Sequence, residues 1–171
     1  MAIDRSMPVL VVDDYGAMID VIRSQLRQLG FLDVDDACSG AEALTKMCVR
    51  RYGLILSDWH MEPITGLDLL TAIRGDANLK QTPFIMVTGE SRSENVIAAK
   101  KAGVNGYIVK PFTAEMLKTK IESVFATRTA ALPERQPARV SQSPQRGDAS
   151  DAMPVSDTLQ LKFPGRFTSG S

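Results

Sequence analysis

The sequence predicts an α/β fold in which five parallel strands form one doubly wound sheet. Short apolar runs recur along the chain, each apolar enough to be buried on both faces, and helical patterns separate them. Four of the runs end at residues with a carboxylate, hydroxyl or amine side chain, namely Asp13 with Asp14, Asp58, Thr88 and Lys110. Because all strands of a parallel sheet finish at one edge, where ligands bind, we expect these side chains to share one pocket.

The first strand is predicted at residues 8–12, and an amphipathic helix follows it. Apolar residues recur there at three- and four-residue steps, which is typical of one helix face, and Gly30 can end the helix. That face is predicted to hold Met18, Val21, Ile22, Leu26 and Leu29. The second strand is predicted at residues 32–36 and the second helix at 41–51, with Leu44, Met47 and Cys48 facing inward.

The third strand is predicted at residues 54–57, followed by a loop over 59–65 and a helix around Leu67, Leu70 and Ile73. The fourth strand is predicted at residues 83–87. Ser91 with Glu94 three residues later is a capping-box pattern, which indicates the start of the next helix. That helix is predicted to carry Val96 and Ile97.

The fifth strand is predicted at residues 107–109, and Thr113 is expected to cap the last helix. The inward face of that helix is predicted to hold Leu117, Ile121, Val124 and Phe125. Five strand–helix units of this length complete a doubly wound domain.

The pattern divides the chain into a domain over residues 1–127 and a tail over residues 128–171. The tail has five prolines, six serines and three glycines in 44 residues, and it lacks a sustained apolar period. Such a segment cannot bury enough apolar surface to offset its ordering entropy, so we predict that it is disordered. One stretch, residues 159–167, mixes apolar and basic residues and could order on a partner.

Composition narrows the classes of function. The 171 residues have a net charge of zero, which gives no argument for nucleic-acid or membrane binding. The only two cysteines, Cys38 and Cys48, are expected to be reduced, buried packing residues. No stretch approaches the roughly 20 apolar residues of a membrane span, and the N-terminus lacks the apolar core of a signal peptide. We therefore expect a soluble, cytoplasmic protein without membrane insertion.

Three carboxylates at one sheet edge imply a bound cation. Two like unit charges about 4 Å apart repel by about 4 kcal/mol at an effective dielectric constant near 20. Oxygen ligands without a Cys or His cluster suit Mg²⁺ or Mn²⁺ better than zinc, and Mg²⁺ often binds phosphate. Lys110 and Thr88 are then placed to contact phosphoryl oxygens. Asp58, alone at the end of the central strand, is the candidate nucleophile, because a carboxylate that attacks phosphorus gives an aspartyl phosphate.

Four short motifs resemble those of the receiver domains of two-component response regulators, above all the stand-alone chemotaxis (CheY-like) type. They are VVDD ending at Asp14, LSDW around Asp58, VTGE around Thr88 and YIVKPFT around Lys110. The similarity covers about residues 8–125, and four motifs in the right order are far more specific than one Asp-Asp pair. The resemblance implies the flavodoxin-like, CheY-like arrangement of the five strand–helix units.

The resemblance also implies roles at the site. Asp58 would accept phosphate from a histidine kinase, and Thr88 and Lys110 would bind the phosphoryl group. Pro111 would follow Lys110 through a cis peptide bond, which proline makes accessible. The Mg²⁺ ligands would be Asp13, Asp14, Asp58 and the backbone carbonyl of His60.

The resemblance further implies how the signal is read. Tyr107 would be an aromatic switch that turns inward on activation. The fourth helix, fifth strand and fifth helix, residues 90–125, would dock a flagellar motor switch or another signalling protein. The protein would act as a monomeric switch in a chemotaxis phosphorelay, and its only catalysis would be its own phosphotransfer and dephosphorylation.

Simpler interpretations stand beside these roles. A tyrosine such as Tyr107 that opens a strand is often plain packing. His60, the only histidine, is favoured as a rim side chain over a side-chain metal ligand or phosphodonor. His60 stands where the chemotaxis proteins have asparagine, and Glu62 separates Met61 from Pro63. Both departures lie on the pocket rim and concern the lifetime of the phosphoryl group.

Two other classes of function fit the sequence less well. A phosphatase of the haloacid-dehalogenase type also forms an aspartyl phosphate, but that family places a second aspartate two residues after its nucleophile, where this chain has His60. A transcription factor needs a DNA-binding element, and the tail contains no helix-turn-helix pattern. We therefore expect no DNA partner.

The tail contains a weaker motif. Arg135 and Arg139 have an Arg-x-x-x-Arg spacing, and together with Asp148 and Ser150 they resemble the cyclic-di-GMP-binding elements of PilZ domains. Guanidinium groups bind phosphates through two hydrogen bonds and stack on purines, so the two arginines are candidate nucleotide ligands. A tail that is inert or docks a protein is the favoured alternative, because disordered segments commonly contain arginines. Cyclic-di-GMP binding would be compatible with the receiver switch.

Overall fold

Strands and helices alternate along the part of the chain that the structure describes. The computed structural model describes residues 3–89 and 91–131. The strands are β1 (Val9–Val12), β2 (Val34–Ala37), β3 (Leu54–Asp58), β4 (Phe84–Thr88) and β5 (Gly106–Val109). The helices are α1 (Gly16–Gln28), α2 (Gly40–Val49), α3 (Gly66–Gly75), α4 (Ser93–Lys101) and α5 (Ala114–Ala131).

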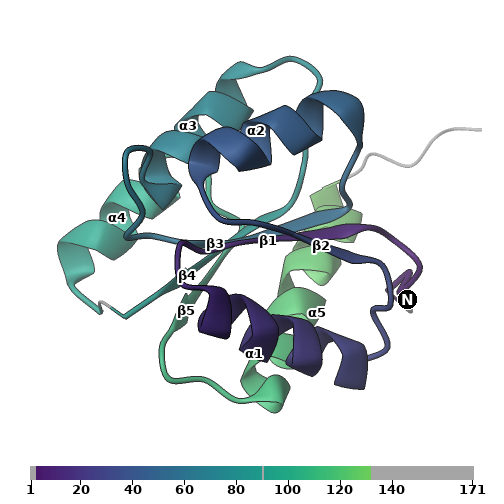
Figure 1. Cartoon of the computed structure of the whole chain (residues 1–171). Helices are drawn as coiled ribbons and strands as arrows, with labels where there is room; N and C mark the ends of the chain where they lie inside the picture. The colour runs from purple at the N-terminus through teal and green to yellow at the C-terminus, as the bar shows by residue number, and fades with distance from the viewer. Residues whose placement is uncertain (1–2, 90, 132–171) are drawn as a thin grey trace, which may run out of the picture. The chain divides into compact units, whose positions relative to one another are not determined.

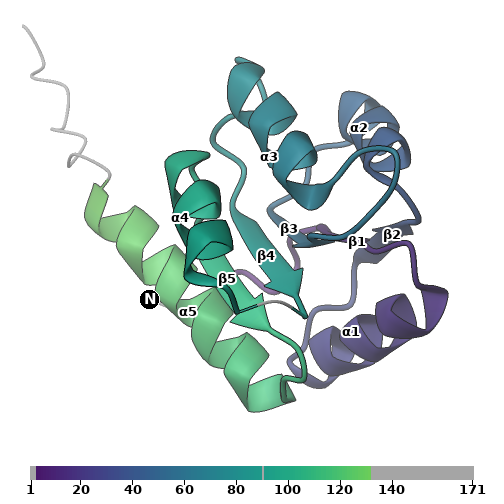
Figure 2. The same cartoon turned by 90° about the vertical axis from the view of Figure 1, so that its left-hand side faces the viewer.

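The strands form one parallel sheet in the order β2-β1-β3-β4-β5. The order reverses between β1 and β3, so the helices that follow these two strands, α1 and α3, lie on opposite faces of the sheet (Figures 1 and 2). In doubly wound folds, ligands bind in the crevice that this reversal opens at the carboxyl ends of the strands. The predicted fold class is confirmed.

Helices cover both faces of the sheet, with α1 and α5 on one side and α2, α3 and α4 on the other (Figures 1 and 2). Strand β1 shows how the two cores divide. Val9 and Val11 pack in the core beneath α1 and α5, while Leu10 and Val12 pack beneath α2 and α3. Successive residues of a strand point to opposite faces of the sheet. Because helices cover both faces, all four side chains are fully buried.

The edge strand β5 is only half buried. Gly106 and Ile108 face the interior, whereas Tyr107 and Val109 keep part of their surface exposed. The prediction of burial on both faces is therefore wrong for this strand, because β5 ends the sheet and has a neighbour on one side only. Tyr107 therefore keeps part of its surface accessible to solvent.

The second strand begins two residues later than predicted. The structure places it at Val34–Ala37, and Leu32 is 81% exposed. The residue before Leu32, Phe31, is buried, and its N–H donates to the Leu26 carbonyl at the end of α1. Once Phe31 fills the core, Leu32 falls on the solvent side.

Two predictions of inward-facing helical residues are also wrong. Val21 is 47% exposed, and Ile19 takes its place in the core of α1. Cys48 is exposed beside the buried Met47, and Cys38 is exposed as well, so the cysteines are free thiols but not buried ones. Neighbouring helical residues lie about 100° apart, so a residue next to a core position falls on the flank.

The helix caps agree with the sequence pattern at one predicted position and differ at another. Thr113 accepts a hydrogen bond from the Met116 N–H at 3.3 Å, as predicted. The capping box predicted at Ser91 and Glu94 does not form, because α4 starts at Ser93 after an extended Arg92 that provides no side-chain cap. A full capping box instead joins Thr65 and Asp68 at the start of α3.

Helix α5 continues to Ala131, so the first four residues of the predicted tail are helical. Residues 132–171, with Arg135 and Arg139, lie outside the described residues, and the predictions of a disordered tail and of nucleotide binding lie there with them. Among the described helices, none has the length and apolar character that a membrane crossing needs.

Candidate functional site

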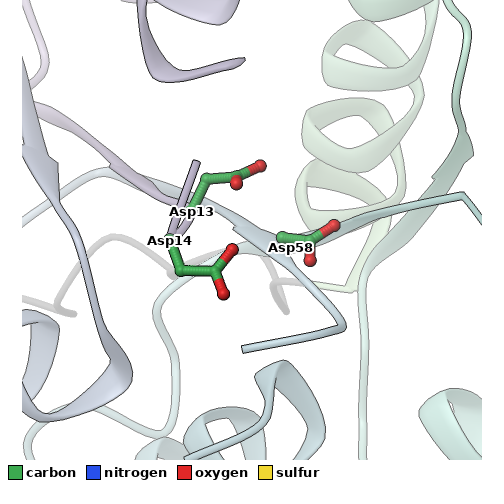
Figure 3. A group of neighbouring side chains, drawn as sticks. All are labelled: Asp13, Asp14 and Asp58. Atoms are coloured by element: carbon green, nitrogen blue, oxygen red, sulfur yellow. The ribbon is translucent and has the colours of Figure 1, made fainter. Parts of the chain in front are cut away.

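Three carboxylates meet at the crevice between β1 and β3. Asp13 and Asp14 directly follow β1, and Asp58 is the last residue of β3. A carboxylate oxygen from each residue lies within 4.8 Å of the others (Figure 3). Asp13 and Asp58 are buried, whereas Asp14 is exposed at the mouth of the crevice. The predicted acidic cluster therefore forms.

Lys110 links two of these carboxylates. Its ammonium lies 2.8 Å from Asp58 Oδ1 and 3.0 Å from Asp13 Oδ2. The lysine directly follows β5 and precedes Pro111, and the bond between them is cis, as the resemblance implied. The lysine side chain is 20% exposed and its ammonium neutralises charge on two buried carboxylates.

Burial and the contacts between charged groups shift the pKa values of Asp13 and Lys110. Burial raises the pKa of the Asp13 carboxyl, and the nearby charge of Asp58 adds to this, against hydrogen bonds from Lys110 and the Tyr15 N–H. Burial alone would lower the pKa of Lys110, but its hydrogen bonds to Asp58 and Asp13 outweigh that effect, so the pKa is raised. Lys110 therefore stays charged beside the acids.

The backbone around Asp58 is held by its neighbours. The second carboxylate oxygen, Oδ2, accepts a hydrogen bond of 2.8 Å from the His60 N–H. The buried Ser57 hydroxyl donates to the Asp58 carbonyl at 2.9 Å, and Gly66 at the start of α3 packs against that same carbonyl. No role at the site was predicted for Ser57 or Gly66. Ser57 belongs to the LSDW motif but its hydroxyl does not point to phosphate chemistry, and a glycine has no side chain that could signal a role.

Thr88 lies on β4, the strand beside that of Asp58, and Tyr107 lies on β5, one strand further. Asp58 is paired with Val87 in the β3–β4 register, which places Thr88 one residue further along the same edge. The Lys110 N–H donates to the Thr88 carbonyl at 2.7 Å, so the predicted threonine and lysine are joined through their backbones. The Thr88 side chain is fully buried, and Tyr107 packs half-buried against the core beneath α2 and α3.

The donor set fits a hard divalent cation. The three acids offer carboxylate oxygens only, and neither a thiolate nor an imidazole belongs to this group. The raised pKa of Asp13 indicates more negative charge than the buried position favours, and a cation would relieve it. Oxygen ligands at an exposed crevice suit Mg²⁺, which usually keeps several of its waters.

A doubly wound sheet with three acids, a threonine and a lysine at its carboxyl edge is an arrangement consistent with the signal-receiver domains of two-component systems. The chain belongs to the response regulator receiver domain family, whose sequence model matches residues 9–122. It is a CheY-like receiver domain of two-component signalling.

Relatives with established names agree with this family. The chain is 45% identical over 119 residues to the chemotaxis protein CheY of Pseudomonas aeruginosa, an alignment that covers 70% of this chain and 96% of that protein. It is 42% identical over 123 residues to the chemotaxis protein CheY-3 of Vibrio cholerae, which covers 72% of this chain and 95% of that protein.

Solved structures agree with the fold. The Vibrio cholerae chemotaxis protein CheY4 matches with a TM-score of 0.66 and 34% identity, over 70% of this chain and 98% of that one. The response regulator TrrA of Thermotoga maritima, solved in complex with Mg²⁺ and BeF, matches with a TM-score of 0.61 and 30% identity, over 69% of this chain and 98% of that one.

Proposed function

We propose that the protein is a phosphorylation switch whose phosphoacceptor is Asp58. One observation carries this proposal: the Asp58 carboxylate is held between the Lys110 ammonium and the His60 N–H, in a crevice shared with two other acids. The hydrogen bonds fix the orientation of the carboxylate. Asp14 is exposed, so the acidic cluster is accessible from solvent on this side.

The reaction follows from this arrangement. A carboxylate oxygen of Asp58 attacks the phosphorus of a phosphohistidine, a new O–P bond forms, and the P–N bond breaks with its electron pair remaining on the imidazole. Lys110 then stabilises a phosphoryl oxygen with the ammonium that now contacts Asp13 and Asp58. Thr88, one residue beyond the strand position paired with Asp58, is placed to donate its hydroxyl to another oxygen.

Asp13, Asp14 and Asp58, together with the backbone carbonyl of His60, would hold Mg²⁺. When bound, the ion supplies positive charge next to the phosphoryl oxygens. The solved TrrA complex with Mg²⁺ and BeF supports this proposal, since TrrA is 30% identical to this chain.

We propose that the surface of α4, β5 and α5 reads the phosphorylation state. Lys110 joins the site to this surface, because it contacts Asp58 and directly follows β5, on which Tyr107 lies half-buried. Ile97 on α4 and Met116 on α5 are about half exposed, at 51% and 49%, and offer apolar contacts to a partner. The names of the chemotaxis relatives support a chemotaxis role, in which a histidine kinase donates the phosphate and a flagellar motor switch is the partner.

Several narrower predictions stay predictions. They include the identity of the kinase and docking partner, the monomeric state, a cytoplasmic site of action, and cyclic-di-GMP binding through Arg135 and Arg139. The alternative phosphatase of the haloacid-dehalogenase type is set aside by membership of the receiver family.

Labelling with a small phosphodonor tests the function. Incubation with acetyl phosphate and Mg²⁺ should add the mass of one phosphoryl group, and Asp58→Asn should abolish the addition. Asp20→Asn, an exposed aspartate of α1, is the matched control and should be labelled like the wild type. Full labelling of Asp58→Asn would refute the assignment.

A further inference from the structure

We propose that Gly66 is a positioning residue for phosphorylation, because the absence of a side chain there lets α3 pack against the backbone of Asp58. A Cβ atom added at Gly66 would lie 2.1 Å from the Asp58 carbonyl oxygen and 3.0 Å from its carbonyl carbon. Contacts this short do not occur between real atoms, so either α3 or Asp58 must move. The inference rests on the proposed role of Asp58 as phosphoacceptor.

The Asp58 carbonyl has little freedom to move away. Its strand is paired with β4 through Asp58 and Val87, and the Ser57 hydroxyl donates a hydrogen bond of 2.9 Å to the carbonyl. Gly66 is itself fixed, since its N–H donates to the Trp59 carbonyl at 2.9 Å. The contact between Gly66 and Asp58 therefore sets where the end of β3 lies relative to α3.

The first residues of three helices provide a comparison within the same chain. Helices α1, α2 and α3 begin at Gly16, Gly40 and Gly66. A Cβ at Gly16 would meet nothing within 4 Å, and one at Gly40 would meet the Ile64 side chain at 2.7 Å. A rotamer change of Ile64 would relieve only this contact, because its Cβ lies 2.9 Å away and moves with the backbone, so Gly40→Ala needs a small shift at Ile64. At Gly66 the obstacle is the backbone of the proposed phosphoacceptor itself.

Helix propensity alone predicts that Gly66→Ala should not destabilise the protein. Alanine is a better helix former than glycine, so replacing a helical glycine that has free space should be neutral or stabilising. A loss of function at Gly66 therefore cannot come from the helix itself. A displacement of about 1 Å at a reacting group commonly slows a reaction by up to about a hundredfold, because the attack geometry is lost.

Three alanine variants of the full chain test the inference: Gly16→Ala, Gly40→Ala and Gly66→Ala. We would measure the rate of labelling by acetyl phosphate at saturating Mg²⁺, the free energy of unfolding in urea, and the ¹³C resonance of the Asp58 carbonyl. Gly66→Ala should be labelled at least about tenfold more slowly than the wild type, with a shifted Asp58 carbonyl resonance. Gly16→Ala and Gly40→Ala should keep both the rate and the resonance, even if Gly40→Ala is less stable.

A second variant separates the two obstacles at Gly66. The added Cβ would also lie 2.9 Å from the Met86 sulfur, which is the end of a flexible side chain. Adding Met86→Ala to Gly66→Ala should not restore labelling, because the clash with Asp58 persists. Recovery in the double variant, or a wild-type rate in Gly66→Ala, would overturn the proposal.

Two further outcomes of the labelling experiment also decide the proposal. If Gly66→Ala does not fold, Ser57→Ala takes its place. The Gly66 contact still holds the carbonyl in that variant, so the labelling rate should stay near that of the wild type, and a loss of about tenfold would assign the positioning to Ser57 and overturn the proposal. If the wild type itself is not labelled, the proposed function fails, while the Asp58 carbonyl resonance still decides whether Gly66 positions this residue.

Discussion

The Lys110 ammonium lies 2.8 Å from a carboxylate oxygen of Asp58, although 52 residues separate them in the chain. The same ammonium contacts Asp13, so one lysine compensates two buried acids. Lys110 also donates its backbone N–H to Thr88, and it directly follows the strand that bears Tyr107. A change at the Asp58 carboxylate can thus reach β5 and α5 through a single residue.

Removing the charge of Lys110 should affect both stability and signalling. Lys110→Ala leaves Asp13 and Asp58 without their cation, and we expect a loss of about 1–3 kcal/mol in the free energy of unfolding without Mg²⁺. Added Mg²⁺ should recover most of this loss, since the ion replaces the missing charge. Urea unfolding with and without Mg²⁺ measures the effect, with the exposed Lys80→Ala as a control.

The same variant tests the route to Tyr107. Beryllofluoride with Mg²⁺ should shift the ring resonances of Tyr107 in the wild type and leave them nearly unchanged in Lys110→Ala. Coupling of this kind is commonly worth about 1–3 kcal/mol. An equal shift in both proteins would show that the signal reaches β5 by another route.

Magnesium binding can be followed through Trp59, the only tryptophan in the chain and the residue next to Asp58. We expect a saturable change in its fluorescence on addition of Mg²⁺. Asp14→Ala should lose the response, because it removes the exposed carboxylate of the cluster. Asp20→Ala should retain it, and an identical curve for Asp14→Ala would place the metal elsewhere.

Ionisation of Tyr52 should lower the stability of the folded protein at alkaline pH. Burial, and next the hydrogen bond from its hydroxyl to Asp35, raise the pKa of Tyr52 to about 12, above the ordinary value of about 10. A raised pKa favours the neutral phenol in the folded state. The contribution of Tyr52 to the free energy of unfolding is therefore complete below about pH 10 and declines as the pH rises from there to about 12.

The difference in ultraviolet absorbance between wild type and Tyr52→Phe during an alkaline titration measures this pKa. Tyr52→Phe should also cost about 0.5–1.5 kcal/mol at neutral pH, because the hydrogen bond to Asp35 is lost. The hydrogen bond from the Tyr52 hydroxyl, and then Arg50, lower the pKa of Asp35. The contribution of the ionised Asp35 to the free energy of unfolding is therefore lost only as the pH drops below the ordinary carboxyl range. A Tyr52 titration near pH 10 would contradict the prediction.

Arg74 should resist replacement by lysine. Its guanidinium donates to the carbonyls of Lys80, Thr82 and Gly103 and to the Asn105 side chain, at 2.7–3.0 Å, and so joins α3 to the loops before β4 and β5. A lysine ammonium cannot reach these acceptors together, and we expect a loss of about 1–3 kcal/mol in urea unfolding. Arg51→Lys is the control, because Arg51 makes one long bond of 3.4 Å, to the Asn78 carbonyl. Equal stability of the two variants would refute this.

The sequence was sufficient to predict the sheet and the gathering of its polar ends. Buried parallel strands need continuous apolar runs, and parallel strands must finish at one edge, so Asp13, Asp58 and Lys110 could be placed together from their positions after such runs. These rules depend on local backbone geometry and on connectivity, and both can be read along the chain.

Only the tertiary structure decided the contacts on which the site depends. Phe31 took the core position that left Leu32 in solvent, and Lys110 placed its ammonium between Asp13 and Asp58. The packing of Gly66 against the Asp58 carbonyl likewise had no trace in the sequence pattern. Such contacts join residues distant in the chain or in separate elements, and their distances are set by how helices pack on the sheet, which no local period of the sequence encodes.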